Sequence, residues 1–262
     1  MIRRALSIFA VGAVAATTAT YLTVVRPLWK RWAIDPAEAA RPLPGDDLVT
    51  SPKLVDTRGI TIAASPGAVW PWLVQMGYGR AGWYSYDAID MSHPSARQIM
   101  PEHQALALGD TMPVAPGSGF EVRVLEPDRA LVLYLDDVHV RGQAAAAHEG
   151  EALPPTPANL RRSGGAIGTL TPGEFQASWA LVLEPTDDGQ TRLIERFRLA
   201  SAMAGRPAEI MAGLLDFGAF VMTRRQMRTL KARVEAAEAM QLTPLELIPM
   251  QPVAPIAEPV PA

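Results

Sequence analysis

The stretches Trp179-Ala-Leu-Val-Leu183 and Arg192-Leu-Ile-Glu-Arg-Phe-Arg-Leu199 are separated by a short polar segment that contains Asp187-Asp-Gly189. Apolar runs joined by a turn with aspartate and glycine favour a hairpin of two antiparallel strands. The same arrangement occurs earlier, where Phe120–Leu125 and Ala130–Leu135 flank a turn that contains a proline. The sequence therefore predicts two hairpins of one antiparallel sheet.

A further strand and a short helix precede these hairpins. Arg58–Ile62 alternates between polar and apolar residues, as a half-buried strand does. Ser65-Pro66 then supplies a capping hydroxyl and a proline at the first helical position, and apolar residues recur at helical spacing as far as Met76. We expect Gly77 to end this helix and Pro71 to kink it.

A long helix over Pro207–Met240 ends the predicted domain. Its second half is basic, with Arg224, Arg225, Arg228, Lys231 and Arg233. The first half carries an apolar face, which we expect to lie across the concave side of the sheet. This face consists of Ile210, Leu214, Phe217 and Val221. The predicted fold class is α+β, with a curved antiparallel sheet wrapped around the C-terminal helix.

The N-terminal segment of this 262-residue chain is predicted to cross a membrane. Ala5–Val25 has 21 residues without charge, histidine, amide side chain or proline, which is enough helix to span the ~30 Å apolar core of a bilayer. Arg3 and Arg4 precede it, and a basic, aromatic segment from Arg26 to Trp32 follows it. We therefore predict an uncleaved anchor in residues 1–31, with an orientation that the charges leave open.

This anchor predicts that the protein sediments with membranes. High salt should not release it, because salt screens charges but does not weaken the burial of apolar surface. Membrane fractionation with a salt wash tests this, and a soluble mature protein that begins near Thr20 would identify a signal peptide instead. We expect removal of residues 1–31 to leave a soluble monomer, because the Pro-rich residues 32–52 suit a solvated spacer.

Two other segments are predicted to lie outside regular elements. Residues 136–176 are rich in alanine, glycine and proline without sustained periodicity, which is typical of an inserted loop. Residues 241–262 form a Pro-rich tail, which we expect to be disordered because each proline removes a backbone donor. One ligand-binding domain over residues 53–240 remains.

Composition excludes several classes of function. The net charge of −3 is spread without a broad basic field, so nucleic acid is not an expected partner. The chain has no cysteine, which excludes disulfides, thiolate metal sites and a cysteine nucleophile. Its four histidines show no metal-binding spacing. We therefore expect no metal and no cofactor.

Four segments carry a family resemblance: Val69-Trp-Pro-Trp-Leu-Val-Gln-Met-Gly77, Gly79-Arg-Ala-Gly-Trp-Tyr-Ser-Tyr-Asp87, Leu108-Gly-Asp-Thr-Met-Pro113 and Trp179-Ala-Leu-Val-Leu-Glu-Pro185. Together they resemble bacterial, membrane-anchored proteins of the START/polyketide-cyclase superfamily, also called SRPBCC or helix-grip. The resemblance implies a seven-stranded curved sheet that grips the C-terminal helix, with an apolar cavity between them. It leaves the activity open, because relatives bind lipids, hormones or polyketides and only some are enzymes.

Glu195 is the candidate catalytic residue. Leu193, Phe197 and Leu199 alternate onto the apolar face of their strand, and the two-residue period places Glu195 on that face as well. A carboxyl group in an apolar cavity has a raised pKa unless a donor pairs with it, and such a group can act as a general acid. The alternative is a structural glutamate bonded to a neighbouring side chain or water.

The predicted ligand-binding residues come from the short helix, from the glycine- and aromatic-rich segment Gly77–Asp87, which we call the aromatic loop, from the inner face of the last strand and from the long helix. Tyr84 and Tyr86 could orient a ligand oxygen, while Asp87 could accept from it or cap the next helix. The complete set is Trp72, Trp83, Tyr84, Tyr86, Asp87, Leu193, Phe197, Leu214, Phe217 and Val221.

Three classes of function follow from these observations. The first is a membrane-tethered monomer that binds an apolar small molecule, such as a lipid, a polyketide or an aromatic compound. The second is an enzyme of the cyclase, aromatase or dehydratase type that uses Glu195. The third is a protein-interaction or stress-response scaffold that uses the Pro-rich tail and the basic helix end.

Overall fold

The computed structural model describes residues 29–90, 94–139, 174–202 and 206–242. The predicted anchor, most of the predicted insertion and the Pro-rich tail lie outside these residues. Within the described ranges, no helix is both long and apolar enough to cross a membrane.

One antiparallel sheet of six strands forms the centre of the described domain, in the spatial order β1-β6-β5-β4-β3-β2. The five strands that the sequence predicts are all present, and β2 is an additional edge strand that was not predicted. The strands are β1 (Leu54–Ile62), β2 (Thr111–Ala115), β3 (Ser118–Glu126), β4 (Ala130–Asp136), β5 (Phe175–Pro185) and β6 (Thr191–Ser201). The seventh strand implied by the resemblance is not among the described residues.

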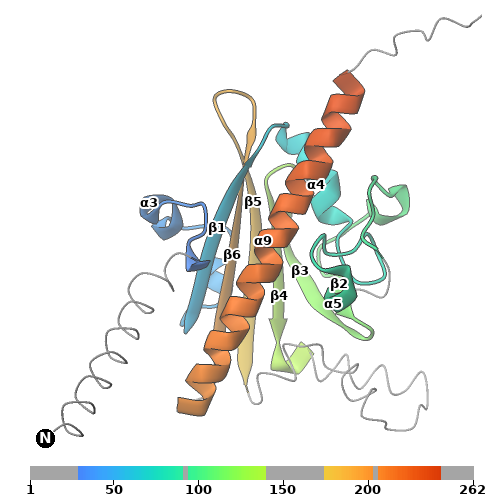
Figure 1. Cartoon of the computed structure of the whole chain (residues 1–262). Helices are drawn as coiled ribbons and strands as arrows, with labels where there is room; N and C mark the ends of the chain where they lie inside the picture. The colour runs from blue at the N-terminus through green and yellow to red at the C-terminus, as the bar shows by residue number, and fades with distance from the viewer. Residues whose placement is uncertain (1–28, 91–93, 140–173, 203–205, 243–262) are drawn as a thin grey trace, which may run out of the picture.

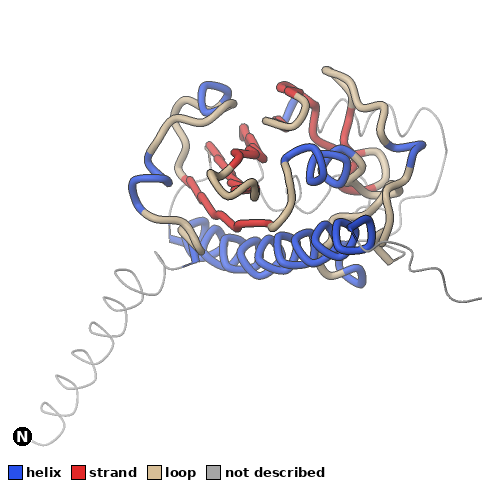
Figure 2. Tube along the Cα trace, turned by 90° about the horizontal axis from the view of Figure 1, so that it is seen from above, coloured by secondary structure: helices blue, strands red, loops and turns tan. Residues whose placement is uncertain are grey.

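Two helices pack on one face of this sheet. The long helix α9 (Arg206–Leu242) crosses the strands, as predicted, and contacts β1 and the helix α4 (Pro66–Val74). Seen from above, α9 lies along one side of the domain and the strands curve above it (Figure 2). The hydroxyl of Ser65 caps α4 by accepting from the amide of Ala68. The result is an α+β layer in which the sheet faces both helices (Figure 1).

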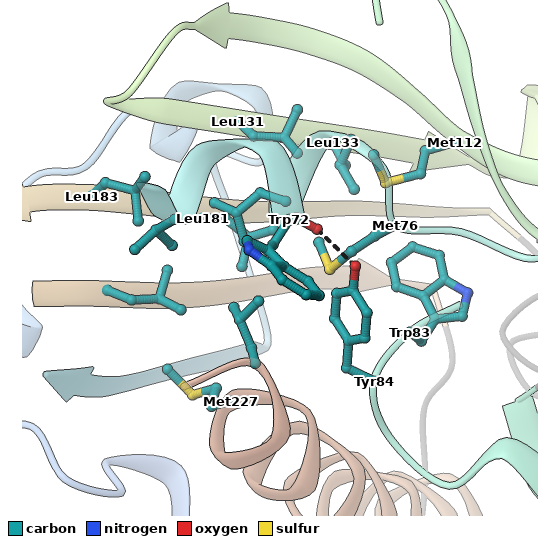
Figure 3. Packing of buried hydrophobic residues seen from close by; sticks show 14 of the residues in the cluster. Trp72, Met76, Trp83, Tyr84, Met112, Leu131, Leu133, Leu181, Leu183 and Met227 are labelled. Atoms are coloured by element: carbon teal, nitrogen blue, oxygen red, sulfur yellow. Dashed lines mark hydrogen bonds between the residues drawn. The ribbon is translucent and has the colours of Figure 1, made fainter. Parts of the chain in front are cut away.

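The main hydrophobic core lies between the concave face of the sheet and these helices. Leucines of β4 and β5 meet Trp72 and Met76, and Met227 approaches them from α9 (Figure 3). The loop after α4 contributes Trp83 and Tyr84, both buried. The aromatic loop is therefore part of the core.

The convex face of the sheet is covered by the segment that the sequence indicated as a solvated spacer. Ile34 and Leu43 are buried against Val182, Ile194 and neighbouring apolar residues of the outer face. The segment contains the short helices α3 (Pro36–Ala40) and η2 (Asp46–Leu48). The expectation of a solvated spacer in residues 32–52 is therefore wrong.

Arginines of β6 explain why this segment is held. They point away from the concave face, as strand parity predicts, but Arg196 is only 3% exposed. Its guanidinium donates to the carbonyl oxygens of Ala39 (2.6 Å) and Arg41 (2.9 Å) and to Asp46 (2.6 Å). Arg198 donates to the carbonyl oxygen of Val49 (3.0 Å). A Pro-rich segment leaves such carbonyls without helical or ladder partners, so guanidinium groups can satisfy them.

The buried face of α9 differs from the predicted one by about one residue position. Phe217 is 47% exposed and packs its ring edge against Trp29 at a centroid distance of 5.2 Å, so its expected place on the interior face is wrong. Val221 is half-buried, and the side chain of Leu214 lies outside what the structure describes. Among the α9 side chains that the structure describes, the buried ones are Asp216, Thr223, Gln226, Met227, Leu230 and Val234. A charged residue at an inward position makes this face hard to identify from hydrophobicity alone.

Candidate functional site

Five charged residues meet in the interior between β1, β6 and α9, and we call them the interior charge cluster. Strand pairing places Arg58 opposite Glu195, and Asp56 lies two residues earlier on the same face of β1. Asp216 comes from α9, and Lys30 comes from the segment before β1. Glu195 is only 3% exposed and accepts a hydrogen bond from Thr223 of α9, so its predicted place on the inner face is confirmed.

Arg58 joins the members of the cluster. Its Nη2 atom lies 3.1 Å from Asp56 Oδ2 and 4.0 Å from Asp216 Oδ1, and its Nε donates to the carbonyl oxygen of Trp29 at 3.1 Å. Lys30 Nζ lies 3.0 Å from Asp56 Oδ1 and 3.4 Å from Asp216 Oδ2. Two cations thus face three carboxyl groups, and one carboxyl can remain protonated without leaving the cluster positively charged.

The pKa values follow from burial and from this charge ratio. Burial raises the pKa of Glu195 to about 7, although Arg58, Thr223 and Trp179 favour its charged form. Burial also raises the pKa of Asp56 to about 6, against the opposing effect of Arg58. Glu195 therefore changes protonation close to neutral pH, as a proton donor or acceptor must.

Besides the two carboxyl oxygens of Asp216, which lie near Lys30 and Arg58, one atom of Glu195 and one of Trp179 are buried without a hydrogen-bond partner among the described residues. Glu195 Oε1 accepts from the hydroxyl of Thr223 at 3.2 Å, but Glu195 Oε2 and Trp179 Nε1 have no such bond. Trp179 lies on the neighbouring strand, paired in register with Phe197, and its indole N–H favours the charged form of Glu195 as a hydrogen-bond donor, although the two side chains do not reach full hydrogen-bond geometry. Buried polar atoms usually have a partner, so this pair offers one acceptor and one donor to a bound molecule or water.

Aromatic rings surround this pair of atoms. Trp83 stacks on Trp179 with ring centroids 5.2 Å apart, and Phe120 meets the same ring edge-on at 5.9 Å. Leu193 is buried and Phe197 is half-buried on the same face of β6 as Glu195. The structure thus brings Trp83, Leu193 and Phe197 of the predicted set together with Glu195.

Tyr84 forms its hydrogen bonds within the core. Its hydroxyl donates to the carbonyl oxygen of Trp72 at 3.2 Å and accepts from Gln75 at 2.7 Å, and burial raises its pKa to about 12. The hydroxyl is therefore used in holding the aromatic loop against α4, and Trp72 is buried beside it at a ring distance of 6.0 Å.

Tyr86 and Asp87 lie at the surface side of the same loop. Tyr86 is 40% exposed, with the guanidinium of Arg225 over its ring at 5.7 Å. Asp87 begins the short helix α5 (Asp87–Asp90) and accepts a hydrogen bond from Ser95. Neither residue lies in the interior charge cluster.

The sequence reasoning missed most of this cluster, although one signal was present. Asp56 and Arg58 alternate with the same period as Ile60 and Ile62, so extending the strand toward its start would have placed both on the inner face. Asp216 gave no such signal, because it interrupts an apolar face. Within the described ranges, no group of three acidic or histidine side chains is placed to hold a metal ion.

Comparisons with known proteins assign no family to this chain. No protein-family model and no curated protein matches it. It is similar to the solved structure of protein MLL2253 from Mesorhizobium loti, with 14% identity and a TM-score of 0.35 over 70% of this chain and 98% of that one. A conserved protein from Geobacillus kaustophilus shares 13% identity, with a TM-score of 0.37 over 70% and 97% of the two chains. The Aha1 dimer from Colwellia psychrerythraea shares 15% identity, with a TM-score of 0.28 over 66% and 93%.

Proposed function

We propose that the protein binds an apolar small molecule with one polar group, in the interior between the sheet and α9, while residues 1–31 tether it to a membrane. The observation that carries this proposal is a buried pair of neighbouring atoms, Glu195 Oε2 and Trp179 Nε1, that have no hydrogen bond of full geometry to any described residue. Lipids, polyketides and aromatic compounds that carry a hydroxyl or carbonyl group are the ligand classes that fit.

The chemistry of the pair explains this choice of ligand. Trp179 can donate to a hydroxyl or carbonyl oxygen, while Glu195 can accept a proton when charged and donate one when neutral. Because the pKa of Glu195 is about 7, both forms are present near neutral pH. The stacked rings of Trp83 and Trp179 supply apolar and aromatic surface for the rest of the molecule.

Binding of 1-hydroxypyrene and of pyrene to the delipidated, full-length protein tests this proposal. We expect the hydroxylated compound to bind about tenfold more tightly, since a hydrogen bond to a charged group is worth about 1.5–3 kcal/mol. Glu195→Gln and Trp179→Phe should each reduce this preference. Fluorescence titration measures both affinities.

The matched control is Glu184→Gln, which changes a surface carboxylate paired with Arg41 and should leave the preference intact. Failure of the delipidated protein to take up either compound, with no molecule co-purifying by native mass spectrometry, would contradict the proposal. Equal affinities for the two compounds would remove Glu195 and Trp179 from recognition.

A second candidate, an enzyme of the cyclase, aromatase or dehydratase type, is favoured by one observation. A buried carboxyl group with a pKa of about 7 is suited to general acid–base catalysis. Turnover of a poly-β-carbonyl substrate that Glu195→Gln abolishes, while substrate affinity is retained, would support this candidate over simple binding.

A further inference from the structure

A second concave site lies at the surface and shares no lining residue with the interior charge cluster. The C-terminal half of α9, Trp72 of α4 and the segment Arg97–Ile99 enclose a groove with a volume of about 830 Å³. This volume is in the range of pockets that hold small molecules. We call it the arginine groove, and it is lined by Trp72, Arg97, Gln98, Ile99, Arg225, Arg228, Thr229, Ala232, Arg233, Ala236, Ala237 and Met240.

Positive charge in this groove is not compensated by ion pairs. Arg97, Arg225 and Arg228 are exposed, and no carboxylate of the described residues lies within 4.0 Å of them or of Arg233. Burial lowers the pKa of Arg233, and repulsion from Arg97 and Arg225 lowers it further, while Tyr84 and Asp87 act in the opposite direction. An anion placed among these arginines would relieve their mutual repulsion.

Aromatic rings hold three of the arginines in place. Arg228 lies over the ring of Trp32 at 5.8 Å, and Arg225 lies over the ring of Tyr86. Arg233 lies over the ring of Tyr84 at 4.9 Å and donates to the carbonyl oxygen of Ala96. A guanidinium group stacked by its face keeps its N–H edge available, and this edge matches the oxygen atoms of a carboxylate or phosphate.

The remaining lining of the groove is apolar. Ile99 is 37% exposed and Met240 is 76% exposed, although both are large hydrophobic residues. Trp72 and the alanines at 232, 236 and 237 continue this surface along α9. A ligand that matches the whole groove therefore has an anionic group and an apolar part.

We propose that the arginine groove binds a small amphipathic anion, in which a carboxylate or phosphate is attached to an apolar chain or ring. Arg97, Arg225 and Arg228 hold the anionic group, and Ile99, Ala236 and Met240 cover the apolar part. This site is separate from the interior one, and it uses neither Glu195 nor Trp179.

Isothermal titration of the full-length protein in phosphatidylcholine nanodiscs with octanoate, octyl phosphate and octanol tests this proposal. Both anions are expected to bind, and octanol should bind at least about tenfold more weakly, because it lacks the charge that the arginines recognise. Arg225→Gln and Arg97→Gln should each weaken binding of the anions about tenfold. Ala236→Trp should block the groove and weaken all three ligands.

Arg224→Gln is the matched control, because Arg224 is the neighbouring residue of α9, is also exposed and lies over Trp32 as Arg228 does, but does not line the groove. The preference for octanoate over octanol should persist in Glu195→Gln, because the arginines of the groove recognise the anion, and this separates the test from that of the interior site. Equal affinity for octanol and octanoate, or an unchanged affinity in Arg225→Gln, would overturn the proposal.

Two further outcomes would also overturn it by naming another occupant. Tighter binding of octanoate after deletion of Thr243–Ala262 would assign the groove to the chain's own C-terminal segment. Binding to vesicles that contain phosphatidylglycerol, without binding to soluble octanoate, would assign it to a membrane surface.

Discussion

Replacement of Arg58 by methionine is expected to lower the free energy of unfolding by about 3–5 kcal/mol at pH 8, since breaking a buried ion pair leaves an uncompensated buried charge. Arg58 is 1% exposed and is paired with Asp56, and its guanidinium also favours the charged form of Glu195. Domains of this size are stable by about 5–15 kcal/mol, so the loss would be a large share of the total. Urea denaturation followed by circular dichroism measures it.

Arg129→Met is the control for this substitution. Arg129 pairs with Glu126 at the surface, where its side chain is 70% exposed, and such a pair contributes about 0–1 kcal/mol. The cost of Arg58→Met should also become smaller at pH 5, because protonated carboxyl groups no longer need a cation. A loss no greater than that of Arg129→Met would show that the cluster does not depend on Arg58.

Strands β1 and β3 to β6 could be predicted because the alternation that identifies a strand is local. The two-residue period also placed Glu195 on the inner face without any knowledge of its neighbours. Strand β2 escaped prediction because Pro113 interrupts it, although a proline is tolerated at the edge of a sheet, where β2 lies. The register shift between Pro113 and Ala115 weakens the pattern further.

Contacts between distant residues could not be predicted in the same way. The segment before β1 appeared solvated because proline and charge dominate it, yet its carbonyl oxygens accept hydrogen bonds from Arg196 and Arg198. Hydropathy contains no information on such bonds. Lys30 and Asp216 reach the interior charge cluster from opposite ends of the described chain, so only the fold reveals their meeting.

The segment before β1 also changes where a truncation that removes the predicted anchor should begin. Removal of residues 1–31 also removes Trp29, which packs on Phe217 and Phe220, and Lys30, which pairs with Asp56. A truncation that retains the domain should therefore begin no later than Trp29.

Glu195→Gln is expected to make the protein more stable than the wild type at pH 8 and to leave its stability nearly unchanged at pH 4.5. The pKa of Glu195 is about 7 in the folded protein, against an ordinary value of 4.5, so the folded state holds the proton more tightly. Between these two values the folded state binds more protons than the unfolded state, and the free energy of unfolding therefore falls as the pH rises. Between pH 4.5 and 7, the carboxyl group of Glu195 lowers the free energy of unfolding by roughly 3 kcal/mol.

Glutamine removes this titration while keeping the shape of the side chain and an oxygen that accepts from Thr223. The free energy of unfolding of the variant should still fall somewhat as the pH rises. The pKa of Asp56 is also raised, to about 6, and its titration changes the stability in the same direction. Urea denaturation of both proteins at pH 4.5, 6 and 8 measures the difference, and Glu184→Gln, at the surface, should follow the wild-type curve. If wild type and Glu195→Gln showed parallel curves, the pKa of Glu195 would be the same in the folded and unfolded states, and the prediction would be wrong.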